Sequence, residues 1–263
     1  IGGGNMASAI IGGLIHQGHP ASQIEVVEPW AEAREALRKN YGIEAQAEAG
    51  PALQRAQIVV WAVKPQTFKD AAAQAKAHTQ GALHLSVAAG IRSDSIAQWL
   101  GTERIVRTMP NTPALVGKGM SALYARPAVS APERQSIEAI MATTGEFLWV
   151  DSEPQLDAVT ALSGSGPAYV FYFLEAMTRA GTDMGLTAAQ AHQLAVGTFV
   201  GASELARRSD ETPAVLRQRV TSKGGTTYAA LQSMEHDAVA EKFMQAMQAA
   251  RQRAHELGDE FGK

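Results

Sequence analysis

Hydrophobic and polar positions follow two different patterns along this chain. Over the first 150 residues, short apolar runs alternate with segments whose apolar residues recur at helical spacing. We expect strands at the apolar runs, which are residues 24–27, 58–63, 83–87, 104–107, 119–124 and 146–150. We expect helices between most of them, for example over residues 7–18 and 31–40. This alternation is typical of an α/β fold with a doubly wound sheet.

The pattern changes after residue 151. From residue 156 to 261 the apolar spacing is helical, and no run reads convincingly as a strand. Glycine, proline and polar residues interrupt this pattern at residues 181–185, 207–213 and 222–225. We therefore expect two domains, an α/β domain over residues 1–152 and an all-α domain over residues 153–263.

The expected helices of the second domain carry apolar residues in excess. They include Val170, Phe173, Leu174, Leu194, Val196, Phe199 and Val200. The aromatic residues Tyr169, Phe171, Tyr172 and Phe173 fit either a core or a subunit interface. Surplus apolar surface on a domain of this size usually marks an interface, so we expect an obligate homodimer.

The composition excludes several classes of protein. A net charge of −3 over 263 residues provides no field for binding nucleic acid or an acidic membrane. No apolar run has the length of a membrane span, and we expect no secretory leader before the first motif. The absence of cysteine excludes disulfides and thiolate zinc sites and is compatible with a cytoplasmic protein. The seven histidines lack metal-ligand spacing, so we expect no metal and no histidine base.

The chain opens on a glycine turn of the type that binds a pyrophosphate. In Gly2-x-Gly4-x-x-Ala7, Gly2 suits a tight bend, Gly4 a close approach of the ligand, and Ala7 the packing of the next helix. The free N–H groups at that helix's start favour a phosphate. By itself the turn is a weak signal. It normally follows a buried strand, so we expect the residues of that strand to be missing before Ile1.

Further polar or small-residue stretches are expected at one edge of the sheet. They are residues 62–66, 86–90, 109–113 and 163–169. Ligands of open α/β sheets bind outside the carboxyl ends of the strands. The small side chains of residues 88–90 leave room there for a flat ring. A glycine- and hydroxyl-rich loop at residues 221–227 offers backbone N–H groups to a small carboxylate.

In their order along the chain, the motifs at residues 62–66, 107–113, 163–169 and 221–227 resemble those of the pyrroline-5-carboxylate reductases. The resemblance extends from residue 1 to about residue 258. It implies a Rossmann-like α/β domain followed by an all-α dimerisation domain, often assembled as a ring of five dimers. It also implies hydride transfer from NADPH or NADH to 1-pyrroline-5-carboxylate, which yields L-proline.

The resemblance assigns site residues by position. The dinucleotide is expected against Ile1, Gly2, Gly3, Gly4, Asn5, Met6, Ala62, Val63, Lys64, Pro65, Val87, Ala88 and Ala89. The substrate is expected against Glu153, Thr226 and Thr227, with Thr227 beside the imine nitrogen as the catalytic residue. The residue types add two groups, Gly164 with Ser165 as a floor for the substrate, and Gly224 with Gly225 as part of the carboxylate loop.

The chain departs from the family's pattern at three positions. Lys223 stands where the family's loop usually has proline, which changes the loop's rigidity and charge. Ala49 and Arg219 stand where some relatives have asparagine, beside the cofactor and beside the substrate respectively. These differences concern individual contacts and leave the resemblance intact.

Glu28 bears on the choice of cofactor. It closes the second expected strand, where a carboxylate accepts hydrogen bonds from the ribose of NADH and repels a 2′-phosphate. Arg34 follows on the next expected helix, near enough in sequence to offset that charge if its side chain points toward Glu28. We expect both cofactors to be used, with NADPH slightly favoured.

Several of these residues also have purely structural interpretations. Lys64 also fits an ordinary surface lysine. Asn111, Thr112 and Thr227 also fit caps of the turns or helices that follow them. Residues 210–211, Asp-Glu, fit a solvated loop better than partners of Lys64.

Two rival functions remain at this point. A 3-hydroxyacid dehydrogenase of the same layout places a catalytic lysine on the first long helix of its second domain, but no lysine lies between Lys118 and Lys223. A non-catalytic dinucleotide-binding protein leaves the loop at residues 221–227 without a role. Imine reduction needs no strong acid, since a cyclic imine is partly protonated in neutral solution, and it depends mainly on positioning.

Overall fold

A computed structural model describes residues 1–262. It divides into two compact units. The first contains Ile1–Pro167 together with the C-terminal residues from Ala249 onward, and the second is Ala168–Gln248. The compact units are not necessarily domains, so the domain boundary expected between residues 152 and 153 stays a prediction.

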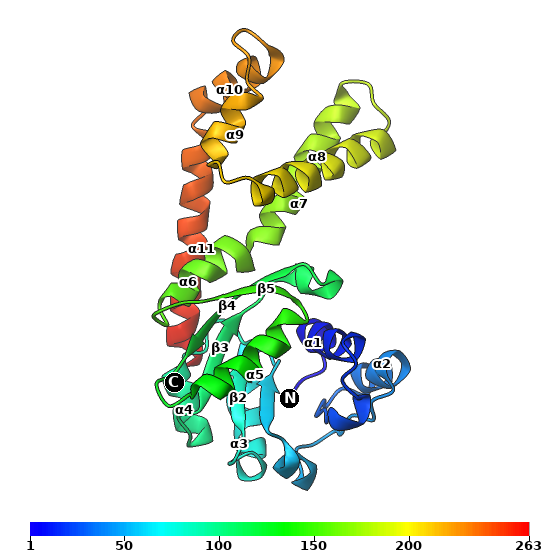
Figure 1. Cartoon of the computed structure of the whole chain (residues 1–263), viewed down its shortest axis with the longest axis vertical. Helices are drawn as coiled ribbons and strands as arrows, with labels where there is room; N and C mark the ends of the chain where they lie inside the picture. Colours follow the sequence, from blue (N-terminus) through cyan, green and yellow to red (C-terminus); the bar gives the residue numbers. More distant parts are fainter. Residues whose placement is uncertain (263) are drawn as a thin grey trace. The chain divides into compact units, whose positions relative to one another are not determined.

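A five-stranded sheet forms the centre of the first unit (Figure 1). Its strands are β1 (Ile58–Trp61), β2 (Leu83–Ser86), β3 (Ile105–Met109), β4 (Gly119–Ala125) and β5 (Gly145–Trp149), in this spatial order. All neighbours are parallel except β3 and β4. Residues 110–118, which join those two strands, are too few for a helical crossover, so β4 returns antiparallel.

The first helices of this unit are α1 (Asn5–His16), α2 (Ala31–Tyr41), α3 (Pro65–Ala75), α4 (Ser93–Leu100), α5 (Ala131–Ala142) and α6 (Gln155–Val159). Helix α2 packs through Leu37 on α1 and on the segment around Val26. Short 3₁₀ turns, among them η4 (Thr112–Val116), fill several connections. This architecture confirms the α/β fold expected from the alternation of apolar runs.

The expected strand at residues 24–27 is wrong as a member of the sheet. This segment makes a single parallel bridge, between Val27 and Gln46. On its other side the Gly2 N–H donates to the Val27 carbonyl at 2.8 Å. Ile1 continues the pairing toward β1, since the Ala62 N–H donates to its carbonyl at 2.8 Å. The segment is therefore extended and paired on both sides, with one bridge and no ladder.

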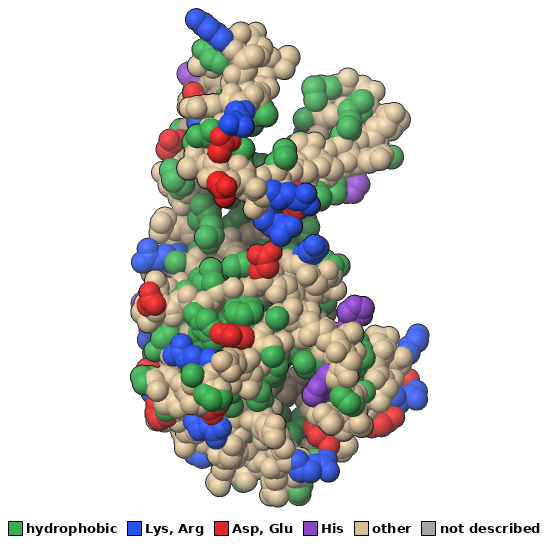
Figure 2. Space-filling model, in the orientation of Figure 1, with side chains coloured by type: hydrophobic (Ala, Val, Ile, Leu, Met, Phe, Trp, Pro, Cys, Tyr) green, Lys and Arg blue, Asp and Glu red, His purple; other side chains and the backbone are tan. Residues whose placement is uncertain are grey.

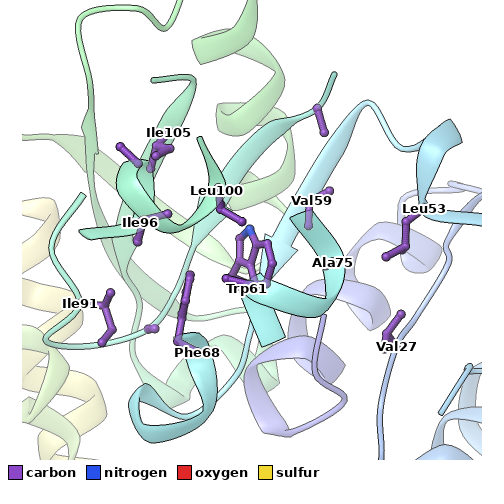
Figure 3. Packing of buried hydrophobic residues seen from close by; sticks show 14 residues of the cluster. Val27, Leu53, Val59, Trp61, Phe68, Ala75, Ile91, Ile96, Leu100 and Ile105 are labelled. Atoms are coloured by element: carbon purple, nitrogen blue, oxygen red, sulfur yellow. The ribbon is translucent and has the colours of Figure 1, made fainter. Parts of the chain in front are cut away.

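The core between the sheet and helices α3 and α4 is built around Trp61 (Figure 3). Its ring is fully buried and stacks on Phe68, with the ring centroids 5.0 Å apart. The indole Nε1–H donates to Nδ1 of His84 at 3.0 Å. Burial lowers the pKa of His84 to about 4, so the imidazole is neutral and able to accept this bond.

The second unit, residues 168–248, consists of helices and the connections between them. Its helices are α7 (Gly166–Asp183), α8 (Ala188–Arg208), α9 (Pro213–Arg219), α10 (Thr226–His236) and the first part of α11 (Val239–Phe261). The predicted interruptions at residues 181–185, 207–213 and 222–225 are confirmed. A further break at residues 237–238, where Ala238 has a φ of 52°, was not expected from the pattern.

Large apolar side chains lie on the surface of this unit (Figure 2). On α7, Phe171 is 63% exposed and Tyr172 is 70% exposed; on α8, Leu194 and Val200 are 59% and 65% exposed. Phe171 and Tyr172 therefore do not belong to the core of this chain, whereas the ring of Phe173 packs edge-on against Phe243. None of the helices in the described part of the chain is long and apolar enough to cross a membrane.

Candidate active site

The glycine turn at the start of the chain is held between two neighbouring segments. Gly2 has a φ of +93°, and a Cβ there would lie 2.4 Å from the carbonyl oxygen of Ala62, so only glycine fits. The Ala62 N–H donates to the Ile1 carbonyl at 2.8 Å. Around Gly4, in contrast, a Cβ would meet nothing within 4 Å. The turn is therefore fixed on the protein side and open on the side where a ligand approaches.

Helix α1 begins directly after this turn without a side-chain cap. Its N-cap is Gly4, and within residues 1–262 no side-chain cap bond is made at this helix start. These N–H groups and the positive end of the helix dipole point toward the open side of the turn. The arrangement can bind a phosphate through the backbone of residues 4–6.

Glu28 supports the turn from within. Its side chain is buried, and Oε2 accepts the Gly3 N–H at 2.7 Å while Oε1 accepts the Trp30 N–H at 2.8 Å. Arg34 donates from Nη1 to the carbonyls of Glu28 and Pro29, at 3.0 and 2.7 Å. The Glu28 carboxylate and the Arg34 guanidinium are therefore both bonded to the backbone of this bend.

The other expected cofactor residues follow the carboxyl ends of β1 and β2. Lys64 is exposed and is the N-cap of α3, and Pro65 is that helix's first residue. The Val87 N–H donates to the Trp61 carbonyl at 3.1 Å, which aligns residues 87–89 beside residues 62–65. The structure thus brings the glycine turn and both strand ends together at one edge of the sheet.

Gly164 and Ser165 lie next to the end of β3. The segment Thr160–Gly164 is a π-helical turn, closed by a 2.8 Å bond from the Ser165 N–H to the Thr160 carbonyl. A Cβ on Gly164 would lie 2.5 Å from the Met109 methyl group, so this turn packs directly on β3. Single π turns within helices often occur at functional sites.

Asn111 fixes this contact. Its Nδ2 donates to the Ser163 carbonyl at 3.1 Å, and its Oδ1 accepts the Met120 N–H at 2.9 Å. It stands at the N-cap position of η4 but makes no side-chain cap bond there, so its interpretation as a cap is wrong. Asn111 instead joins β4 to the small-residue turn at Ser163.

The loop at residues 221–227 lies in the second unit and ends in α10. Gly224 has a φ of +73°, and the Gly225 N–H closes the turn on the Ser222 carbonyl at 3.0 Å. The N-cap of α10 is Gly225, which has no side-chain cap bond. Thr226 and Thr227 are exposed at the first turn of the helix. Thr227 is therefore not the N-cap; it lies in the first turn of α10, a part of a helix whose N–H groups suit an anion.

Glu153 is bonded to Arg107 and Ser93, a contact that the sequence did not predict. Its Oε1 accepts from Arg107 Nη1 and from the Ser93 N–H, and its Oε2 from the Ser93 hydroxyl, each at 2.6 Å. Arg107 is 8% exposed and Glu153 is 20% exposed. The one available signal was an arginine inside the apolar run at residues 104–107, which needs a buried acidic partner. Contact between Glu153 and the substrate stays a prediction.

Glu211 and Arg219 bind each other. Glu211, in the loop between α8 and α9, accepts a hydrogen bond from Arg219 at 2.5 Å, as suits a solvated loop residue. Within residues 1–262, no group of three or more histidine, aspartate or glutamate side chains is arranged to hold a metal ion.

Comparison with known proteins agrees with both halves of the chain. Residues 153–257 match the family model for pyrroline-5-carboxylate reductase dimerisation, and residues 1–90 match that for NADP oxidoreductase, coenzyme F420-dependent. The pyrroline-5-carboxylate reductase of Pseudomonas aeruginosa is 44% identical over 265 residues, which cover 100% of this chain and 97% of the relative. That of Haemophilus influenzae is 39% identical over 98% of this chain and 96% of the relative.

Solved structures give the same result. A pyrroline-5-carboxylate reductase from Coxiella burnetii superposes with a TM-score of 0.89 and 37% identity over 97% of this chain and 96% of that one. A pyrroline carboxylate reductase from Plasmodium falciparum, solved with NADP bound, has a TM-score of 0.88 and 27% identity over 98% of this chain and 96% of that one.

Proposed function

The chain belongs to the pyrroline-5-carboxylate reductase family, and from this we propose how its residues divide the reduction of 1-pyrroline-5-carboxylate to L-proline by NAD(P)H. The edge formed by the glycine turn and by residues 62–65 and 87–89 holds the dinucleotide. The loop at residues 221–227 holds the substrate. One observation carries the proposal. The glycine turn, residues 62–65 and residues 87–89 come together at the start of α1, which has no side-chain cap.

In this proposal the pyrophosphate rests on the N–H groups of residues 4–6, and the nicotinamide lies beside the small residues Ala88 and Ala89. When bound, the reduced cofactor supplies the hydride that the imine carbon accepts. Small side chains allow a flat ring to approach closely, and the fixed turn lowers the entropy cost of ordering it.

The substrate's carboxylate is held by the N–H groups at the start of α10, where the backbone of Gly224 and Gly225 leaves room for it. Thr227 then places its hydroxyl on the ring nitrogen. As the carbon takes the hydride, the protonated imine nitrogen becomes a neutral amine, and the hydroxyl steadies that changing charge. Gly164 and Ser165, beside the end of β3, form part of the substrate's floor.

For the cofactor we propose a modest preference for NADPH over NADH. Both oxygens of Glu28 already accept a backbone N–H, which reduces their repulsion of a 2′-phosphate, and Arg34 carries its charge at the same bend. Removing one charge-assisted hydrogen bond costs roughly tenfold in affinity.

Arg34→Ala is therefore expected to lower the ratio of kcat/KM for NADPH to that for NADH by about tenfold. Arg38→Ala is the matched control, since Arg38 pairs with Glu35 on the exposed side of the same helix. Glu28→Ala is expected to weaken both cofactors, because Gly3 loses its buried acceptor, and to shift the ratio toward NADPH. Steady-state kinetics with both nucleotides measures the ratios; equal ratios in all four proteins would refute this account of the preference.

We further propose that the active form is an obligate homodimer. The match of residues 153–257 to a dimerisation family model and the exposed side chains of α7 and α8 support it. We expect sedimentation at micromolar concentration to show no monomer. A ring of five dimers, as the resemblance implies, would sediment as a species of ten chains; a fully active monomer would contradict the proposal.

The function itself is tested by product formation. The purified chain with NADPH and 1-pyrroline-5-carboxylate is expected to yield one L-proline for each NADPH oxidised, as measured by chromatography and absorbance. Absence of proline with either nucleotide would end the proposal. A cytoplasmic location is also proposed, and the absence of cysteine is compatible with it.

A further inference from the structure

The segment from Ala88 to Ser95 leaves the carboxyl end of β2 and becomes the first turn of α4. Beyond Val87 it is no longer part of the sheet, and Gly90 turns it with a φ of +73°. Its position is therefore set by what lies around it. In the first unit, two pieces of chain distant in sequence hold it.

The first of these is Glu153. Its carboxylate accepts both the N–H and the hydroxyl of Ser93, the first residue of α4, and it is itself paired with Arg107 on β3. A carboxylate at a helix start satisfies a free N–H and interacts favourably with the helix dipole. Arg126 adds a bond from Nη1 to the same Ser93 hydroxyl, at 3.1 Å. Ser93 is thereby anchored to the sheet through Glu153.

The second is the C-terminal end of α11, which lies beside α4 (Figure 1). The Ser95 hydroxyl donates to the Gly262 carbonyl at 2.8 Å, and Arg92 pairs with Asp259 at 2.5 Å. The helix approaches so closely that a Cβ on Gly90 would lie 2.7 Å from the Leu257 Cβ. Gly258 is buried, and a Cβ there would lie 3.0 Å from Arg92 Nε.

We infer that Glu153 and the end of α11 act as a clamp that positions residues 87–89 for the nicotinamide. This inference rests on the proposed function, because it takes residues 87–89 as the wall of the cofactor site. Glu153 is then a positioning residue. Three hydrogen bonds already occupy its carboxylate, which offers about four acceptor sites in all.

The clamp and a substrate contact predict different measurements. If Glu153 positions the cofactor loop, Glu153→Gln weakens NADPH binding even when no substrate is present. If Glu153 contacts the substrate, the same variant leaves NADPH binding unchanged and raises only the KM for 1-pyrroline-5-carboxylate. We expect the Kd for NADPH, titrated by nucleotide fluorescence without substrate, to rise about tenfold, as loss of a charged hydrogen bond implies.

The chain offers a closely matched control in Glu133. Its carboxylate accepts the N–H and hydroxyl of Ser130, both at 2.7 Å, and Arg104 Nε at 2.6 Å, which is the same set of donor types. The side chain is 18% exposed, against 20% for Glu153. Arg104 precedes β3, so its backbone lies at the sheet edge opposite the carboxyl end of β2.

Glu133→Gln is expected to reduce the melting temperature as much as Glu153→Gln does, without changing the Kd for NADPH. Equal changes of Kd in both variants would show general destabilisation and overturn the clamp. The second arm is tested by Gly258→Val, which pushes against Arg92 and Gly90 and is expected to raise the same Kd. An unaltered Kd there would overturn the part assigned to α11.

The outcome for the wild-type chain separates this inference from the proposed function. If the wild type binds NADPH but forms no proline, the proposed reaction fails while the Kd comparison still decides the clamp. A wild type that binds no NADPH would overturn both.

Discussion

A Thr227→Val enzyme is expected to keep its fold and its affinity for NADPH and to lose about 10²–10³-fold in kcat. Valine has nearly the shape of threonine but lacks the hydroxyl that we place on the ring nitrogen. A hydrogen bond that strengthens as the nitrogen changes charge lowers the barrier. One that is equally strong in the bound substrate affects only the KM. Steady-state kinetics that separate kcat from KM therefore measure the role directly.

Thr227→Ser is the matched control, since it keeps the hydroxyl, and we expect activity close to that of the wild type. The alternative that Thr227 caps α10 is not supported, because the N-cap is Gly225 and carries no side-chain bond. A Thr227→Val enzyme with normal kcat and KM would remove Thr227 from the mechanism.

The second large effect concerns stability in acid. The pKa of His84 is lowered to about 4 by burial, whereas an unfolded chain restores it to about 6.5. Above pH 6.5 the group is neutral in both states and contributes no pH dependence. Between pH 6.5 and 4 only the unfolded chain binds the proton, so stability falls as the pH falls. The whole interval is worth about 3 kcal/mol in the free energy of unfolding.

His84→Gln is expected to remove that part of the acid dependence. Glutamine retains a carbonyl oxygen for the Trp61 indole N–H, whereas a protonated histidine would present a second donor to it. Denaturant unfolding at pH 7 and pH 4, at one protein concentration, gives the difference between variant and wild type. His19→Gln, at an exposed position, is the control. Parallel pH profiles for wild type and His84→Gln would contradict this role of His84.

Much of the fold could be predicted because local patterns agree with it. The continuous apolar run at residues 58–63 predicts a buried strand, and breaks of glycine, proline and polar residues predict where α7, α8 and α9 end. The segment at residues 24–27 differs from its prediction, since Val26 and Val27 are buried but the segment makes a single bridge and no ladder. The antiparallel direction of β4 depends on the length of its connection and not on the strand's own residues.

The candidate site could be predicted unevenly for a similar physical reason. The glycine turn at Gly2 could be predicted because its backbone requirement is local. The loop at residues 221–227 could be predicted from its composition. The bonds from Glu153 to Ser93 and Arg107 join residues 60 and 46 positions apart, and no spacing rule connects them. Asn111 likewise bridges two segments that only the folded chain brings together.

The most direct test of the whole account is a crystal structure of the protein with NADP⁺ and L-proline bound. We expect the pyrophosphate on the N–H groups after Gly4 and the nicotinamide beside Ala88 and Ala89. We also expect the proline carboxylate on the backbone at the start of α10, with the Thr227 hydroxyl on the ring nitrogen. An ordered proline that makes no contact with residues 221–227 of any subunit would contradict it.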